Sequence, residues 1–301
     1  MSKPLSKLLR REQFAFLARD HSTWGDHLDK VRAFLGEGLQ SADPTRPVLI
    51  LGAGSGLEVP WALAPPDTTG WDGDPWSRMW TAARHYRWPP WVFEDLTGGM
   101  SELEATARRA VREPWSGHRR ALDAAKTRLT GLLPSLVPDP NALRAWIGAH
   151  RPRTILVANV MGQFGVMAEK IVETVFGGPP WDPDPEREEP LAEALAAWTA
   201  RAIKAVLRVL CESGADLWLV HDRAVVFGGG ALDLGPWEDD WTRHLRAEGS
   251  SLEASDALAG VDPSSFLLGN ELNLIERDRW IWPVAPGQRH LIEALAIRRK
   301  V

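Results

Sequence analysis

Residues 48–59 read VLILGAGSGLEV, and this stretch decides the expected fold. Its first part, Val48–Leu51, is a continuous apolar run, which is typical of a strand buried on both faces. Three glycines follow within residues 52–56. Glycine allows the positive φ of a sharp turn and lets the backbone approach a ligand closely. A short helix is expected over residues 58–63, with its free N–H groups facing polar ligand atoms.

Two more strands are expected within the next forty residues or so. Thr68–Trp71 and Trp91–Phe93 have the composition of short strands. Between them, Asp74 can cap a helix that has Pro75 at its first position and runs to about His85. The order strand, helix, strand, helix, strand is typical of a parallel α/β sheet with right-handed crossovers.

The rest of the chain supplies the remaining parts of such a sheet. Thr154–Asn159 and Ala215–His221 are predicted strands, and Leu191–Ser213 keeps helical spacing along one apolar face. Trp280–Val284 and His290–Ile297 flank a turn and predict an antiparallel hairpin. The predicted fold is therefore α/β and Rossmann-like: a seven-stranded, mostly parallel sheet with an antiparallel C-terminal hairpin and a helical cap.

The expected organisation is one main domain with two helical additions. An N-terminal helical segment covers residues 1–45, and the main domain covers residues 46–301. Residues 97–152 form a helical insertion in that domain. We expect the N-terminal segment and the insertion to cap the ligand site.

Composition excludes several classes of protein. The chain has 301 residues, is 44% hydrophobic and 25% charged, and carries a net charge of −5, which is typical of a soluble globular protein and argues against a surface built to hold polyphosphate. Its one cysteine, Cys211, excludes an internal disulfide, and the histidines lack metal-binding spacing, so no metal is expected. Without an evident signal peptide or membrane-spanning run, the expected location is the cytoplasm.

The glycine spacing separates two kinds of nucleotide site. A dinucleotide site uses G-x-G-x-x-G, but Leu57 stands where that pattern needs its third glycine. Asp72 ends the second predicted strand twenty residues after Gly52, and a carboxylate there can accept hydrogen bonds from both ribose hydroxyls. Asp95 and Leu96 follow the third predicted strand, where they could hold an adenine amino group and ring.

With these features the chain resembles the class I S-adenosylmethionine (SAM)-dependent methyltransferase family, whose glycine loop has the G-x-G-x-G spacing. The segments VLILGAGSG, TTGWDGDPWSRMWTAAR, WVFEDL and TILVANVMGQFG, then the terminal hairpin, resemble the family's motifs in order. They cover about residues 48–96, 153–165 and 191–297. The chain departs from the family at Ile50, where an acidic residue is usual.

The resemblance implies SAM as the cofactor and a set of residues around it. The glycine turn would line SAM, with Asp72 and Gly73 at its ribose, Asp95 and Leu96 at its adenine, and two residues after the fourth strand at the methyl group. In full, the expected cofactor residues are Gly52, Ala53, Gly54, Ser55, Gly56, Asp72, Gly73, Asp95, Leu96, Asn159 and Val160.

The candidate catalytic residues are His221 and Asn159. His221 ends a strand, and a histidine is the usual side chain for taking up a proton near neutral pH. Asn159 could orient an acceptor through its amide. The structural alternative for His221 is a hydrogen-bonded histidine at a strand end. Asp222 and Gln163 also follow predicted strands.

The expected function is SAM-dependent methyl transfer, with a small-molecule acceptor favoured because no nucleic-acid module is evident. Two alternatives stay open: a non-catalytic SAM- or nucleotide-binding module, and an RNA methyltransferase that uses the basic stretch 108–128. An NAD(P) oxidoreductase is disfavoured by Leu57. The acidic stretch 182–189 is expected to be a solvated loop. Among 16 tryptophans, Trp71 and Trp76 flank the expected ribose site and are candidates for ligand contact.

Overall fold

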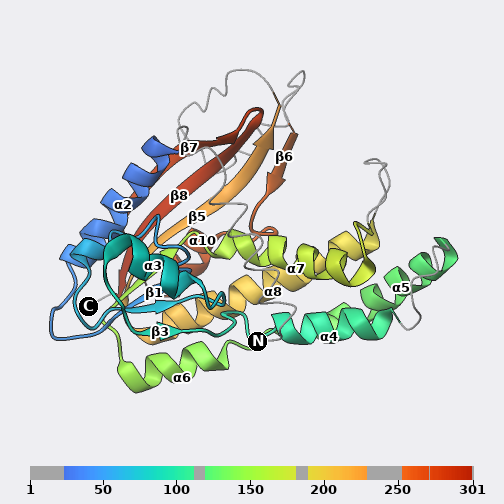
Figure 1. Ribbon diagram of the computed structural model, residues 1–301, viewed down its shortest axis with the longest axis horizontal. Coiled ribbons are helices and arrows are strands. Elements are labelled where there is room, and N and C mark those ends of the chain that lie inside the picture. Colours follow the sequence, from blue (N-terminus) through green and yellow to red (C-terminus); the bar gives the residue numbers. More distant parts are fainter. Residues whose placement is uncertain (1–23, 112–118, 181–188, 229–252, 271, 300–301) are drawn as a thin grey trace.

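The computed structural model describes residues 24–111, 119–180, 189–228, 253–270 and 272–299. Within these ranges the chain forms one mixed sheet with helices on both faces (Figure 1). Residues 1–23 and 182–188 lie outside them, so the expectations for the start of the N-terminal segment and for most of the acidic stretch are not addressed.

The sheet runs in the order β3-β2-β1-β4-β5-β8-β7. Neighbours from β3 to β5 pair in parallel, and β8 pairs antiparallel with both β5 and β7. The bounds are β1 Val48–Leu51, β2 Thr69–Trp71, β3 Trp91–Val92, β4 Thr154–Ala158, β5 Asp216–Phe227, β6 Glu253–Asp256, β7 Leu272–Ala285 and β8 Gln288–Arg299. The predicted α/β fold class with its C-terminal hairpin is confirmed.

The antiparallel part of the sheet is larger than the sequence suggested. β5, β7 and β8 have 12, 14 and 12 residues, and they extend well beyond the short parallel strands (Figure 1). β6 is an additional strand that pairs antiparallel with the outer half of β5, so the sheet has eight strands among the described residues. A register shift after Asp222 separates the two halves of β5.

Two hydrophobic cores lie on the two faces of the sheet. On one face, α2 (Gly25–Gln40) and the short 3-10 helix η2 (Trp61–Leu63) pack against Ile50, Trp218 and Trp282. α3 (Ser77–His85) lies beside the glycine turn. The other face is covered by α4 (Met100–Ala110), α5 (Arg119–Leu132), η3 (Leu133–Ser135), α6 (Asn141–His150), α7 (Met161–Phe176), α8 (Pro190–Ser213) and α10 (Pro263–Leu268).

The helical insertion mainly extends the second of these layers. α4 packs against α7, and α5 packs against α8 (Figure 1). Its contribution to the site is the start of α4, where Met100 lines the cavity described below. The division into a segment over residues 1–45 and a domain over residues 46–301 stays a prediction.

Neither a membrane-spanning helix nor a metal-binding cluster is found in the part of the chain that the structure describes. None of the described helices combines the length and the apolar character needed to cross a bilayer. In the same part of the chain, no group of three or more His, Cys, Asp or Glu side chains is arranged to hold a metal ion.

Candidate functional site

A cavity of about 420 Å³ opens at the carboxyl ends of the parallel strands. Its walls come from the loops after β1, β2, β3 and β4, from the first turns of α7, and from β5 and the β7–β8 hairpin. β1 lies between β2 and β4, so the strand order reverses at this point. Open α/β sheets bind ligands in the crevice at such a reversal.

The glycine turn after β1 forms the floor of the cavity. Gly52, Gly54 and Gly56 all have positive φ, at +68°, +50° and +72°. A Cβ on Gly52 would lie 2.4 Å from Cβ of Val160, so this glycine allows the turn to pack against the end of β4. A Cβ on Gly54 would meet nothing closer than 3.7 Å, and this residue lines the cavity. Gly54 therefore keeps space open where a ligand can approach the backbone.

The helix predicted over residues 58–63 is wrong. One turn of 3-10 helix, η2, is present instead, and the loop that precedes it has no regular structure. Pro60 precedes η2, and Pro65 and Pro66 follow it closely. Proline lacks an N–H and breaks a helix interior, so the segment between these prolines is too short for an α-helix.

Because no α-helix forms here, the carbonyl groups of this loop need other hydrogen-bond donors, and basic side chains supply them. Three consecutive carbonyl groups, at residues 55, 56 and 57, each accept a hydrogen bond from a different side chain. The donors are Arg84 Nη1 to Ser55 at 2.5 Å, His85 Nε2 to Gly56 at 2.9 Å and Arg32 Nε to Leu57 at 2.7 Å. Burial lowers the pKa of both Arg84 and His85. These three hydrogen bonds hold the loop in place although it has no helical hydrogen bonds of its own.

Asp72 connects the glycine turn to the end of β2. Its Oδ2 accepts a hydrogen bond from the Gly54 N–H at 3.0 Å, and its Oδ1 accepts one from the Asp74 N–H at 2.8 Å. Burial raises the pKa of Asp72 to about 6, against the lowering effect of these hydrogen bonds. The side chain lines the cavity and also takes part in a side-chain hydrogen bond with Ser77. A carboxylate has about four acceptor positions, so acceptor capacity is left for a ligand hydroxyl.

Asp95 and Leu96 also line the cavity, as predicted from their position after β3. Asp95 organises the loop that leads into α4: its Oδ1 accepts from the N–H and the hydroxyl of Thr97, and its Oδ2 accepts from the Met100 N–H at 2.7 Å. Glu94, the preceding residue, lines the cavity and accepts a hydrogen bond from Trp71 Nε1 through its carbonyl. Trp71 itself is a core residue and does not line the cavity.

Asn159 links the ends of β4 and β5 inside the cavity. It has a left-handed backbone, with φ of +47°, and its N–H donates to the Val220 carbonyl at 2.8 Å. Its Oδ1 accepts a hydrogen bond from the Asp222 N–H at 3.0 Å. The side-chain amide group is left to face the cavity. Val160, the next residue, also lines the cavity and packs against Gly52.

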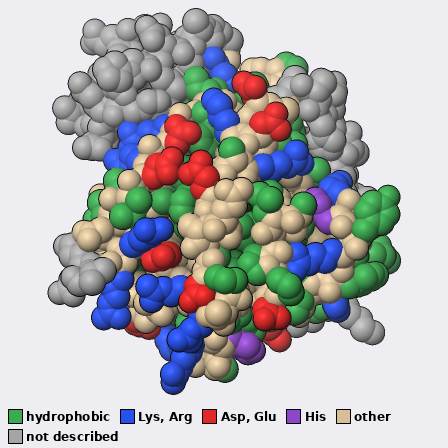
Figure 2. Space-filling model, turned by 90° about the vertical axis from the view of Figure 1, so that its left-hand side faces the viewer, with side chains coloured by type: hydrophobic (Ala, Val, Ile, Leu, Met, Phe, Trp, Pro, Cys, Tyr) green, Lys and Arg blue, Asp and Glu red, His purple; other side chains and the backbone are tan. Residues whose placement is uncertain are grey.

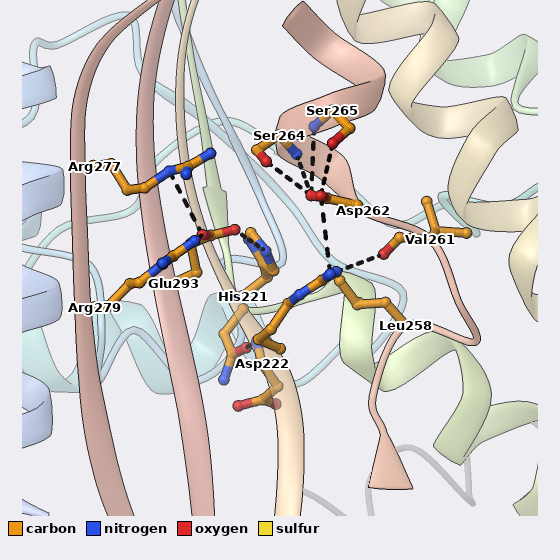
Figure 3. Close-up of polar contacts among 12 residues, drawn as sticks. His221, Asp222, Leu258, Val261, Asp262, Ser264, Ser265, Arg277, Arg279 and Glu293 are labelled. Atoms are coloured by element: carbon orange, nitrogen blue, oxygen red, sulfur yellow. Dashed lines mark hydrogen bonds and ion pairs between the residues drawn. The ribbon is translucent and has the colours of Figure 1, made fainter. Parts of the chain in front are cut away.

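The structure places His221 away from the cavity. The side chain is fully buried, and its Nε2 lies 3.4 Å from Oε2 of Glu293, which also contacts Arg279 at 2.8 Å. In Figure 3 the ring points toward Glu293, while the carboxylate of Asp222 points away from this cluster. The reason is the alternation of side chains along β5, which sends consecutive residues to opposite faces of the sheet. His221 therefore does not support the predicted role of base.

Several cavity residues beside β5 and the β7–β8 hairpin were not among the predicted site residues. His290 on β8 places its Nδ1 3.1 Å from Oδ1 of Asp222. Gln288, Trp282 and Glu58 complete this end of the cavity. The sequence predicted the hairpin that carries three of these residues. It could not predict which hairpin residues face the site, because that depends on the register of β8 against β5.

Of the Asp, Glu, Lys and Arg side chains that the structure describes, those that line the cavity are all acidic. Among the described residues, the lining includes no Lys or Arg. It includes six carboxyl side chains: Glu58, Asp72, Asp74, Glu94, Asp95 and Asp222. Carboxylates around a partly enclosed space favour a ligand that carries positive charge and disfavour a pyrophosphate.

No family model matches this sequence, and no curated protein matches it. Solved structures with related folds do exist. A SAM-dependent methyltransferase from Anabaena variabilis is 10% identical, with a TM-score of 0.41, over 92% of this chain and 94% of its own. The N-methyltransferase NodS from Bradyrhizobium japonicum is 11% identical, with a TM-score of 0.38, over 90% of this chain and 96% of its own.

A third structure, from Pyrococcus horikoshii and provisionally described as an RNA methyltransferase, is 9% identical, with a TM-score of 0.41, over 92% of this chain and 85% of its own. At these scores the likeness assigns no residue, ligand or acceptor. The parallel sheet with its antiparallel C-terminal hairpin agrees with the class of fold that the sequence resemblance implied.

Proposed function

We propose that the cavity binds SAM and that the protein transfers its methyl group to a small-molecule acceptor. The observation that carries this proposal is the site's charge: a cavity at the sheet's reversal point, floored by a glycine turn and lined by carboxylates without a Lys or Arg among the described residues. SAM carries a sulfonium and an ammonium group, which such a lining attracts. The pyrophosphate of NAD(P) would be repelled by the same lining.

The residues present fit SAM at three points. Gly54 leaves its Cβ direction open, so the loop can approach the ligand closely. Asp72, with Gly73 beside it, keeps acceptor capacity for a ribose hydroxyl. Leu96 offers an apolar surface beside Asp95 for the adenine. Asn159 and Val160 would then border the methyl group.

Methyl transfer requires little chemistry from the protein beyond alignment. When bound, SAM supplies a methyl group that its sulfonium already activates. The chain's residues hold the two reactants in line and exclude water. Asn159 contributes by fixing the end of β5 next to the glycine turn, through its hydrogen bond to the Asp222 N–H.

A small-molecule acceptor is supported by the cavity and by the surface. A volume of about 420 Å³ lies within the usual range for small-molecule sites, roughly 300–1,000 Å³. The basic stretch offers few free cations among its described side chains: Arg108 pairs with Glu104, Arg109 with Glu102 and Lys126 with Glu189. On the face drawn in Figure 2, which is the opposite side from α5, acidic and basic side chains are interspersed, so that face does not favour a polyanion.

Titration calorimetry of the purified protein with SAM, S-adenosylhomocysteine (SAH) and NAD tests the proposal. We expect SAM and SAH to bind with micromolar or tighter affinity and NAD to give no heat of binding. Binding of NAD alone would overturn the proposal. Binding of SAM and SAH without methyl transfer to any acceptor would instead leave a non-catalytic SAM-binding module.

A further inference from the structure

We propose that His290, oriented by Asp222, is the catalytic base that takes a proton from an amine acceptor, so that the methyl group is transferred to nitrogen. This inference rests on the proposed function and names the substrate class of the same site. His290 thus takes the role of base that was expected of His221, whose side chain is buried away from the cavity.

The hydrogen bonds of His290 define its tautomer. Its Nε2 lies 3.0 Å from Nε2 of Gln288, and because an amide nitrogen can only donate, the histidine nitrogen accepts. The proton of a neutral ring then sits on Nδ1, which donates to Oδ1 of Asp222 at 3.1 Å. This leaves an Nε2 lone pair on a residue that lines the cavity, and an entering amine can take the place of Gln288 on it.

Asp222 is itself held firmly in place. Its N–H donates to Asn159 Oδ1, and the side chain is almost fully buried. A Cβ added to Gly162, in the first turn of α7, would lie 3.2 Å from its Oδ2, so the carboxylate sits against a helix N-terminus, which favours negative charge. An ionised Asp222 orients the imidazole and stabilises the positive charge that the ring gains with the proton.

The surroundings of His290 favour a positively charged acceptor. Trp282 lies edge-on to its ring, with centroids 5.3 Å apart, and stacks on His27 of α2 at 3.9 Å. His27 Nδ1 accepts a hydrogen bond from Trp280 Nε1 at 3.0 Å, and its Nε2 lies 3.5 Å from Oε1 of Glu58. The titratable groups around this end of the cavity are thus Asp222 from β5, His27 from α2 and Glu58 from the loop after β1.

The reaction balances with these groups. An alkylammonium is drawn by Asp222 and Glu58 and passes one proton to Nε2 of His290. The freed nitrogen lone pair forms a bond to the methyl carbon, while the carbon–sulfur bond breaks and its electron pair returns to sulfur. SAH and a methylated ammonium leave, and His290 releases its proton to water.

The test compares the wild type with His290→Gln and Asp222→Asn, and uses His150→Gln as the matched control because His150 is an exposed histidine on α6. The probes are SAM with benzylamine or benzyl alcohol, two acceptors of nearly the same shape. Methyl transfer is followed by SAH release, and SAH affinity is measured separately by calorimetry.

We expect the wild type to methylate benzylamine at least tenfold faster than benzyl alcohol. His290→Gln should lower kcat by about 100-fold or more, within the usual contribution of a general base, while SAH affinity changes less than about threefold. In His290→Gln the rate should rise with pH only through the ionisation of benzylamine itself, because free amine is then the only form that can react, whereas the wild type and His150→Gln should share a profile that differs from it. In ¹⁵N NMR spectra of the SAH complex, His290 should show the Nδ1–H tautomer, and Asp222→Asn should shift its population.

Three results would overturn the inference while SAH still binds: equal or faster methylation of the alcohol, no methylation of benzylamine, or a kcat of His290→Gln within threefold of the wild type. Failure of the wild type to bind SAH is a different result, because it removes the proposed function itself.

Discussion

The two ends of the cavity are built in different ways. The end below β1 and β2 is shaped by backbone: three glycines with positive φ, and a carboxylate that holds two N–H groups within the same short stretch of chain. The end beside β5 and β8 is shaped by side chains that the sheet brings together from distant positions, such as Asp222 and His290. The geometry of the first end is therefore set within one stretch of the chain, while that of the second depends on strand pairing and register.

Neighbouring residues on β5 illustrate the second case. Asp222 faces the cavity, and His221 faces a buried ion-pair cluster on the other side of the sheet (Figure 3). We therefore expect a substitution on the cavity face of β5 to affect activity, and one on the opposite face to affect stability.

The largest effect is expected for Gly52→Ala, at the backbone-built end. The new Cβ would lie 2.4 Å from Cβ of Val160 and 2.8 Å from the Ala158 carbonyl, at a φ of +68°. The left-handed conformation and the clash together should cost about 3–4 kcal/mol of unfolding free energy. Urea denaturation measures it. Gly54→Ala is the matched control, because its Cβ meets open space, and should cost only about 1 kcal/mol; equal losses in the two variants would contradict this account.

Glu293→Gln tests the buried face of β5. Burial acts to raise the pKa of Glu293, but His221 and Arg279 lower it to about 2. A carboxylate with a depressed pKa stabilises the fold above pH 4.5 or so, and this contribution is lost as the pH falls toward 2. The variant should lose about 3 kcal/mol at pH 7 and show a flatter stability profile across that window.

The control for this variant is Glu276→Gln, at an exposed position on β7. Its unfolding free energy at pH 7 should stay within about 0.5 kcal/mol of the wild type. A Glu293→Gln protein as stable as the wild type at pH 7 would show that the cluster contributes nothing net.

The same contrast explains what the sequence could predict. The glycine turn, Asp72 and Asn159 directly follow short buried strands, and Asp95 comes shortly after β3, so the sequence could predict that they all lie at one edge of the sheet. His290 could not be found in this way, because its approach to Asp222 depends on the register of β8 against β5. The choice of His221 over Asp222 failed for a related reason, since a strand pattern does not say which face carries the ligand.

The missing helix after β1 was a different kind of error. A helix was expected over residues 58–63, but the prolines at residues 60, 65 and 66 leave room for only one turn of 3-10 helix. Basic side chains from α2 and α3 instead satisfy carbonyl groups of the loop. Arg32, Arg84 and His85 are 25 to 29 residues away from the carbonyl groups they bind, so the local sequence does not predict these hydrogen bonds.

Asp72 should make SAM binding sensitive to mild acid. Its pKa is raised by burial to about 6, so the carboxylate is largely ionised at pH 7 and mostly protonated at pH 5. A protonated carboxyl loses acceptor capacity for the ribose hydroxyls and no longer attracts the sulfonium. Calorimetry should show SAM affinity falling by about tenfold between pH 7 and pH 5. Asp67→Asn, at an exposed acid in the same region, should leave that profile unchanged, whereas a flat wild-type profile would contradict the role of Asp72.

The smallest effect is expected for Arg84→Met, which keeps the apolar stem and removes the hydrogen bond to the Ser55 carbonyl. The loop would keep its bonds to His85 and Arg32, so the fold should persist while the glycine turn becomes less ordered. Loss of one such bond should weaken SAM binding by about 1 kcal/mol, or roughly fivefold. Arg46→Met, at an exposed position before β1, is the matched control and should bind SAM as the wild type does. If both variants bind alike, the loop is rigid without its bracing arginine, and its conformation is fixed by the three glycines and Asp72 alone.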